Sequence, residues 1–162
     1  MTLQAASPRT FLVITDGSVE FAAALRFACR RARSTDGTVA ILRVIAPVVF
    51  EHWSGVRDEI ERQARAEAAE EVQAFAPLVR AETGHDPEVL LIRADDTREA
   101  LRRVISADRD IKILVLAAAT GGRGPGPLVN SIAREGVRWG GRNLPVTVVP
   151  GDLSDAEIDD LA

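Results

Sequence analysis

The sequence contains no tyrosine, and aromatic residues make up only 4% of its 162 residues. Binding sites that stack single-stranded nucleic acid need several aromatic side chains, so a site of this kind is excluded. The 20 Lys and Arg residues are outnumbered by 24 Asp and Glu residues, which gives a net charge of −4 and argues against a basic surface for nucleic acid. No apolar run approaches the length that spans a bilayer. We therefore expect neither nucleic acid nor a membrane as partner.

Cysteine is nearly absent as well. Cys29 is the single cysteine, so no internal disulfide can form, and a reducing, cytoplasmic setting fits best. Residues 1–9 lack the charged-then-apolar pattern of a signal peptide. The hydrophobic fraction of 46% and the charged fraction of 27% are typical of a globular protein. The length predicts one domain over 1–162, with its core at about 9–150 and an acidic C-terminal tail at 151–162.

Short β-branched runs alternate with helical patterns along the chain. The first run, Thr10-Phe-Leu-Val-Ile-Thr15, is almost continuously apolar, as expected for a strand covered on both faces. Alternating strands and helices indicate right-handed β-α-β units. We therefore predict an α/β fold, a three-layer doubly wound sandwich around a five-stranded parallel sheet of order 3-2-1-4-5. The predicted strands cover 10–15, 39–45, 89–92, 111–117 and 146–149; the predicted helices cover 19–34, 56–82, a segment opening at 96, and 128–139.

Three segments leave the pattern less definite. Pro77 lies inside the apolar stripe of the helix predicted over 56–82, and we expect it to kink that helix or end it early. The segment 48–55 gives no prediction. Ser154-Asp-Ala-Glu157 resembles a capping box for a last short helix, with a frayed tail as the alternative.

The motifs of common catalytic sites are missing. There is no Gly-Lys-Ser/Thr of a P-loop, since the one lysine, Lys112, begins a strand, and no Gly-x-Ser-x-Gly nucleophile elbow. His52 and His85 are far apart in sequence and have no obvious acidic or cysteine partner, and Cys29 is interpreted as a small core residue. We predict no catalytic residue and no metal site.

Two segments stand out as a candidate binding site. Asp16-Gly-Ser18 follows the first predicted strand, and the stretch 117–131 follows the fourth. If those strands are neighbours, both segments meet where the strand order reverses, which is where ligands bind in such sheets. Glycines there would let backbone amides approach a phosphate, and the start of the next helix would add N–H donors. The alternative is structural: Asp16-Gly-Ser18 would then only lead into a helix, and the glycines would form a surface loop.

Several motifs resemble the universal stress protein family. Phe11-Leu-Val-Ile-Thr-Asp-Gly-Ser18 looks like the opening of its members, and Ile41-Leu-Arg-Val-Ile45 looks like their second strand. The strongest match lies near the end, in Ile113-Leu-Val-Leu116, Leu128-Val-Asn-Ser-Ile132 and Asn143-Leu-Pro-Val-Thr-Val-Val149. The resemblance covers about 9–150 and is weakest between 48 and 87.

The resemblance implies where a nucleotide would bind. Many family members hold ATP with Gly-x-x-Gly, nine residues, then Gly-Ser or Gly-Thr. This spacing is kept here, but all three glycines are replaced, by Ala117, Thr120 and Asn130, while Ser131 is retained. The implied ligand is ATP or AMP, with Mg²⁺ as a companion, or no nucleotide, since some members lack both the motif and ATP. The implied contacts are Thr15, Asp16 and Val44 near the adenine and Thr120, Asn130 and Ser131 near the phosphates, with Ala117 and Ile132 as further binding residues. Arg123 lies among the glycines of the loop and faces either the phosphates or solvent.

Two functions remain open at this level. The first is a small cytoplasmic regulatory or stress-response module with an adenine-nucleotide site between strands one and four, and at most a slow ATPase activity. The second is a dimeric interaction protein with an empty crevice. Family members commonly pair through the last strand, and the apolar run Val146, Thr147, Val148 and Val149 offers an edge for a homodimer.

Overall fold

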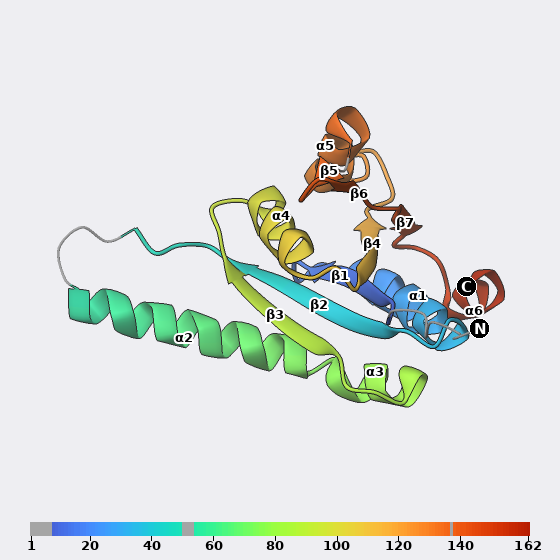
Figure 1. The fold of residues 1–162 in the computed structure, drawn as a ribbon, viewed down its shortest axis with the longest axis horizontal. Coiled ribbons are helices and arrows are strands. Elements are labelled where there is room, and N and C mark those ends of the chain that lie inside the picture. Colours follow the sequence, from blue (N-terminus) through green and yellow to red (C-terminus); the bar gives the residue numbers. More distant parts are fainter. Residues whose placement is uncertain (1–7, 50–53, 137) are drawn as a thin grey trace, which may run out of the picture.

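The computed structural model describes residues 8–49, 54–136 and 138–162. Its centre is a parallel sheet with the strand order β3-β2-β1-β4-β7, which confirms the predicted architecture, β7 being the fifth strand of the sheet. Figure 1 shows the sheet with helices on both faces. The elements in chain order are β1 (Thr10–Thr15), α1 (Phe21–Ser34), β2 (Thr38–Ile45), α2 (Ser54–Gln73), α3 (Ala76–Thr83), β3 (Glu88–Arg93), α4 (Thr97–Ala107), β4 (Ile111–Ala118), α5 (Pro127–Glu135), β5 (Arg138–Trp139), β6 (Arg142–Asn143), β7 (Val146–Pro150) and α6 (Asp155–Leu161).

The alternation of side chains along β1 divides the core into two layers. Phe11 and Val13 point to one face and pack with α1, α3 and α6, whereas Leu12 and Ile14 point to the other face and pack with α4 and α5. Successive side chains of a strand point to opposite faces, so a strand covered on both sides must be apolar throughout. This is why the central strands read as continuous apolar runs.

The order of the strands creates the crevice. From β1 the chain builds outward through β2 and β3, then returns to the other side of β1 to form β4 and β7. The ends of β1 and β4 therefore lie side by side, with their helical connections leaving on opposite faces. A sheet of this kind opens a binding crevice beyond the carboxyl ends of these two strands.

The long helix predicted over 56–82 is two helices. α2 ends at Gln73, and α3 begins at Ala76 with Pro77 in its first turn. A proline is tolerated in the first turn of a helix, because the N–H groups of that turn have no partner within the helix. The break turns Phe75 inward, where its ring meets that of Phe21 edge-on at 4.9 Å between centroids. Pro77 thus ends the first helix early, as predicted.

The helix predicted over 128–139 is too long, and this prediction is corrected. α5 spans Pro127–Glu135, and Gly136 follows with a φ of 72°. The chain then forms an antiparallel hairpin of β5 and β6, joined by Gly140 and Gly141, which both have positive φ. Such a turn needs left-handed geometry at both central residues, which glycine adopts without strain. Trp139 is consequently a buried hairpin residue rather than the end of a helix.

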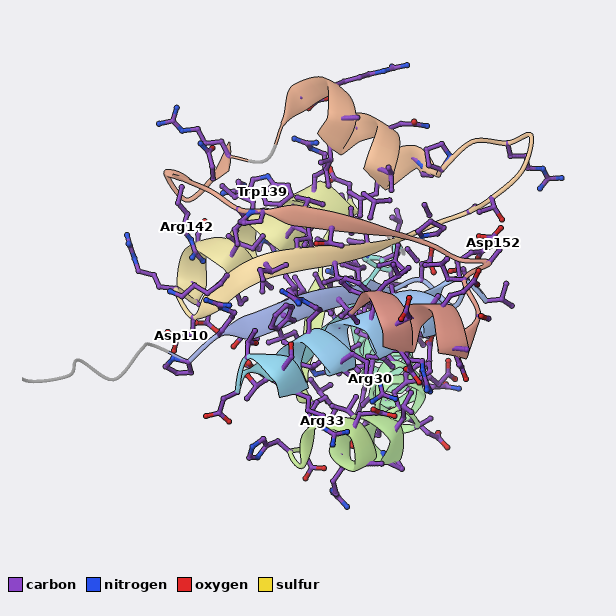
Figure 2. The ribbon with its side chains drawn as sticks, turned by 90° about the vertical axis from the view of Figure 1, so that its right-hand side faces the viewer. Arg30, Arg33, Asp110, Trp139, Arg142 and Asp152 are labelled. Carbon is purple, nitrogen blue, oxygen red and sulfur yellow. The ribbon has the colours of Figure 1, made fainter. Side chains whose placement is uncertain are left out.

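The hairpin is attached to the end of α4 by one arginine. Arg142 donates through Nη1 to the carbonyls of Arg109 (3.2 Å) and Ile111 (2.9 Å), and through Nη2 to those of Ile105 (2.8 Å) and Asp108 (2.6 Å). Figure 2 shows Arg142 beside Trp139 on this side of the molecule. The last carbonyls of a helix have no partner within the helix, and a cation there also interacts favourably with the helix dipole. Arg142 therefore satisfies the C-terminal end of α4 from a distant part of the chain.

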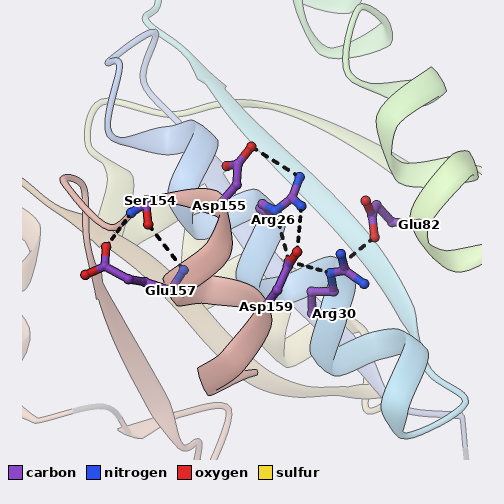
Figure 3. A network of polar contacts seen from close by, with 7 residues as sticks. All are labelled: Arg26, Arg30, Glu82, Ser154, Asp155, Glu157 and Asp159. Atoms are coloured by element: carbon purple, nitrogen blue, oxygen red, sulfur yellow. Dashed lines mark hydrogen bonds and ion pairs between the residues drawn. The ribbon is translucent and has the colours of Figure 1, made fainter.

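The acidic C-terminal segment forms a helix. Ser154 and Glu157 make the reciprocal hydrogen bonds of a capping box at the start of α6. Ile158 is fully buried against α1. Figure 3 shows Asp159 between Arg26 and Arg30. Its Oδ2 lies 3.0 Å from Nη2 of Arg26, and its Oδ1 lies 2.8 Å from Nε of Arg30. The hydrogen bond from Arg26 holds the pKa of Asp159 below its usual range. Of the two alternatives, helix and frayed tail, the structure shows the helix.

None of the helices within the described ranges is long and apolar enough to cross a membrane.

Candidate functional site

A cavity of about 420 Å³ lies between the ends of β1 and β4. Its volume falls within the range of small-molecule sites, and it sits where the strand order reverses. Apolar side chains from both strands line it, together with the first turn of α5, the first residue of α4 and the residue that precedes α1. The lining residues are Ile14, Asp16, Ser18, Glu20, Thr97, Leu116, Ala117, Ala119, Pro125, Gly126, Pro127, Leu128 and Val129.

The β1 side of the cavity is a tight turn. The Oδ1 atom of Asp16 accepts a hydrogen bond from the N–H of Ser18 at 2.9 Å, and Gly17 between them has a φ of 77°. This local bond is the side-chain turn that Asp favours, and it orients the carboxylate. Thr15, directly before it, is buried, and its Oγ1 has no hydrogen-bond partner among the described residues.

The β4 side of the cavity is a glycine loop that leads into α5. Gly126 has a φ of 105°, which a residue with a side chain rarely adopts, and Pro127 begins the helix. The first helical hydrogen bond runs from the N–H of Asn130 to the carbonyl of Gly126 at 3.1 Å. The amides of Leu128 and Val129 precede it and therefore belong to the unpaired donors of the first turn. Both residues line the cavity.

Only part of the predicted site comes together here. Asp16 and Ala117 line the cavity, and Thr15 lies next to Asp16. Val44 packs beside Ile14 in the core and borders a different hollow of about 310 Å³, together with the ion pair of Arg43 and Glu71. The other predicted residues do not line the cavity: Thr120, Arg123 and Asn130 are exposed, and Ser131 and Ile132 are half-buried on α5.

Asn130 and Ser131 lie one turn further into α5 than the predicted site requires. The motif spacing places them at a helix start, but Pro127 begins the helix three residues before Asn130. The Oγ of Ser131 instead accepts a hydrogen bond from Nη1 of Arg98 at 2.7 Å. Arg98 also pairs with Glu135 at 3.2 Å, and its guanidinium carbon lies 5.9 Å from the centroid of the Trp139 ring. Ser131 thus belongs to the contact between α4 and α5.

The residue-by-residue prediction left out five lining residues of interest: Glu20, Thr97, Ala119, Leu128 and Val129, of which the last three lie in the stretch 117–131 that the sequence singles out. One signal for the last two was present. Gly126 followed by Pro127 marks a helix start, because proline is favoured at the first helical position. The predicted helix start at about 128 agrees with this signal and implies that the first free amides lie near Leu128 and Val129. Nothing local marks Thr97, which reaches the cavity only through the packing of α4.

Cys29 is the single cysteine, and it is buried. Burial raises the pKa of the Cys29 thiol to about 12, so it remains protonated at neutral pH. Residues 8–49, 54–136 and 138–162 contain no group of three His, Cys, Asp or Glu side chains placed to hold a metal ion. What the cavity offers is an apolar floor, backbone amides and two carboxylates.

The fold and the cavity define an α/β protein with a ligand crevice at the reversal of strand order. The chain belongs to the universal stress protein family, whose family model matches residues 8–152. No curated protein sequence matches the chain.

Solved structures show the same fold at low sequence identity. The universal stress protein UspA from Lactobacillus plantarum is 16% identical, with a TM-score of 0.68 over 89% of this chain and 99% of that one. A universal stress protein in complex with cAMP is 17% identical, with a TM-score of 0.61 over 91% and 100%. An Arabidopsis thaliana member with AMP bound is 15% identical, with a TM-score of 0.54 over 88% and 92%.

Proposed function

We propose that this universal stress protein is a regulatory binding module that holds an adenine nucleotide in the cavity between β1 and β4. The observation that carries the proposal is the position of a cavity of about 420 Å³ at the reversal of strand order, opposite the first turn of α5. Family members of the same fold bind AMP and cAMP. The single, buried cysteine fits a cytoplasmic setting.

Each wall of the cavity would have its own role in binding. Ile14, Leu116 and Ala117 form the apolar surface that would cover a base or ribose. Polar recognition of the nucleoside would come from Asp16 and Ser18. The amides of Leu128 and Val129 would hold a phosphate, since the N-terminus of a helix attracts anions. Mg²⁺ would enter only with ATP, and Asp16 is a lining carboxylate whose oxygen is oriented by a hydrogen bond. We propose binding as the activity of this site.

Thermal unfolding with ligands tests this proposal. AMP at a hundred times its dissociation constant is expected to raise the free energy of unfolding by about 2.7 kcal/mol, because it binds only the folded state. The matched variants are Ala119→Trp, which places a large side chain at the cavity, and Ala133→Trp, which places it on an exposed part of α5. The first should weaken AMP binding at least about tenfold, and the second should leave it unchanged.

The same experiment separates the alternative function. If AMP, ATP and cAMP all leave the unfolding temperature unchanged, the protein is an interaction module with an empty crevice. A stabilisation that survives in Ala119→Trp would mean that a nucleotide binds, but in another place.

We further propose that the protein forms a homodimer through Val146, Thr147, Val148 and Val149. β7 pairs with β4 on one side only, so its other side is a sheet edge in the described chain. The side chain of Val148 is 42% exposed there. An exposed apolar edge strand is a template for pairing with another chain.

Charge at that edge should separate the two copies. Val148→Asp would bring two carboxylates together in the interface, so light scattering after size exclusion should report a monomer. Val56→Asp is the matched control, since Val56 is equally exposed (50%) but lies on α2, which packs on β2 and β3. A Val148→Asp protein that remains dimeric would place the interface elsewhere.

A further inference from the structure

The charge of the cavity points to a narrower class of ligand, an inference that rests on the proposed function. The two ionisable side chains in the lining are Asp16 and Glu20, both carboxylates. Of the described residues that form the lining, none is Lys, Arg or His. A polyphosphate would therefore bring several negative charges to a wall that is already negative, in a site partly shielded from water.

The cations closest to the cavity along the chain are either engaged elsewhere or outside its lining. Arg98 follows Thr97 of the lining, but its guanidinium donates to Ser131 and pairs with Glu135. Arg123 lies in the exposed glycine loop and does not line the cavity. Neither provides the fixed, bidentate contact with which arginine usually binds phosphate.

The positive groups that do face the cavity are the backbone amides at the start of α5. Pro127 has no N–H, and the N–H of Asn130 is bonded to Gly126, which leaves the amides of Leu128 and Val129. The two free amides and the partial charge at the start of α5 match one phosphate group, and they do not neutralise three.

We propose that the cavity selects an adenine nucleotide with a single phosphate over di- and triphosphates. The phosphate is held by the first turn of α5. The carboxylate of Glu20 acts against additional phosphates, which makes it a determinant of specificity. The side chain of Glu20 is held in position by the segment that follows β7. A Cβ on Gly151 would lie 2.2 Å from Glu20 Cγ, so Gly151 packs directly on the side-chain carbons of Glu20.

Calorimetric titration of the wild-type protein with adenosine, AMP, ADP and ATP tests this order, at constant ionic strength and with or without Mg²⁺. AMP is expected to bind at least about tenfold more tightly than ATP in both conditions, and more tightly than adenosine. ATP binding as tightly as AMP, or adenosine binding as tightly as AMP, would overturn the inference. Failure of all four compounds to bind would instead refute the proposed nucleotide site.

Removing the charge of Glu20 tests the assigned residue. Glu20→Gln keeps the carbon atoms against which Gly151 packs and removes one negative charge. The preference for AMP over ATP should fall at least about threefold, because ATP gains more than AMP from the lost repulsion. Glu70→Gln, at an exposed position of α2, is the matched control and should leave the preference unchanged. An unchanged preference in Glu20→Gln would show that Glu20 does not discriminate.

Discussion

Replacing Arg142 with alanine is expected to lower the free energy of unfolding by about 3 kcal/mol. One guanidinium donates four hydrogen bonds to the carbonyls of Ile105, Asp108, Arg109 and Ile111. Its removal takes the arginine donor away from the carbonyls of Ile105 and Asp108 at the end of α4 and from that of Ile111 at the start of β4, and it releases the hairpin. Leaving half-buried carbonyls unpaired costs more than the loss of an exposed hydrogen bond, because water replaces the donor incompletely. Urea unfolding followed by circular dichroism measures the change.

Two variants identify the cause. Arg138→Ala removes an exposed arginine from the partner strand of the same hairpin, and its effect should stay within about 0.5 kcal/mol. Arg142→Lys keeps the charge but not the planar fork of donors, so its loss of stability should lie between the two. Equal stability of Arg142→Ala and Arg138→Ala would contradict the proposed attachment of the hairpin.

Ile158→Ala is expected to lower the free energy of unfolding by a similar amount, about 3 kcal/mol. Ile158 is fully buried and packs in the same core layer as Cys29 and Val149. Truncation removes apolar burial and leaves a cavity between α6 and α1. The effect should be visible in a shift of the urea midpoint without a large change in slope.

Leu161 supplies the control on the same helix. It is 64% exposed, so Leu161→Ala should change the free energy of unfolding by less than about 0.5 kcal/mol. If Ile158→Ala is as stable as Leu161→Ala, residues 155–161 contribute nothing to the core, and the segment is a tail after all.

The sheet could be predicted from the sequence because its strands are short apolar runs separated by clear helix patterns. Phe11 to Ile14 are apolar on both faces, which only a doubly covered strand requires. The capping box at Ser154 could also be predicted, because a local hydrogen-bond pattern needs no distant partner. α6 is held in place because Ile158 packs against α1, and the local sequence pattern does not predict this contact between distant segments.

The hairpin and half of the site could not be predicted in this way. Trp139 continued the apolar pattern of α5, and the turn at Gly140 and Gly141 is stabilised by Arg142 reaching α4, a contact between distant segments. Likewise, the motif spacing placed Asn130 and Ser131 at the phosphates, although the predicted helix already began at about 128. The free amides are those of Leu128 and Val129, two residues before the motif positions, because Pro127 begins the helix.

Amide chemical shifts on titration with AMP test the central claim most directly. The account predicts that the largest changes occur at Ser18, Ala117 and Val129, which are distant in sequence and line one cavity. Residues of the second hollow, such as Ala46 and Ala64, should stay nearly unchanged. Changes concentrated at Ala46 and Ala64 would place the ligand beneath α2 and contradict a nucleotide site between β1 and β4.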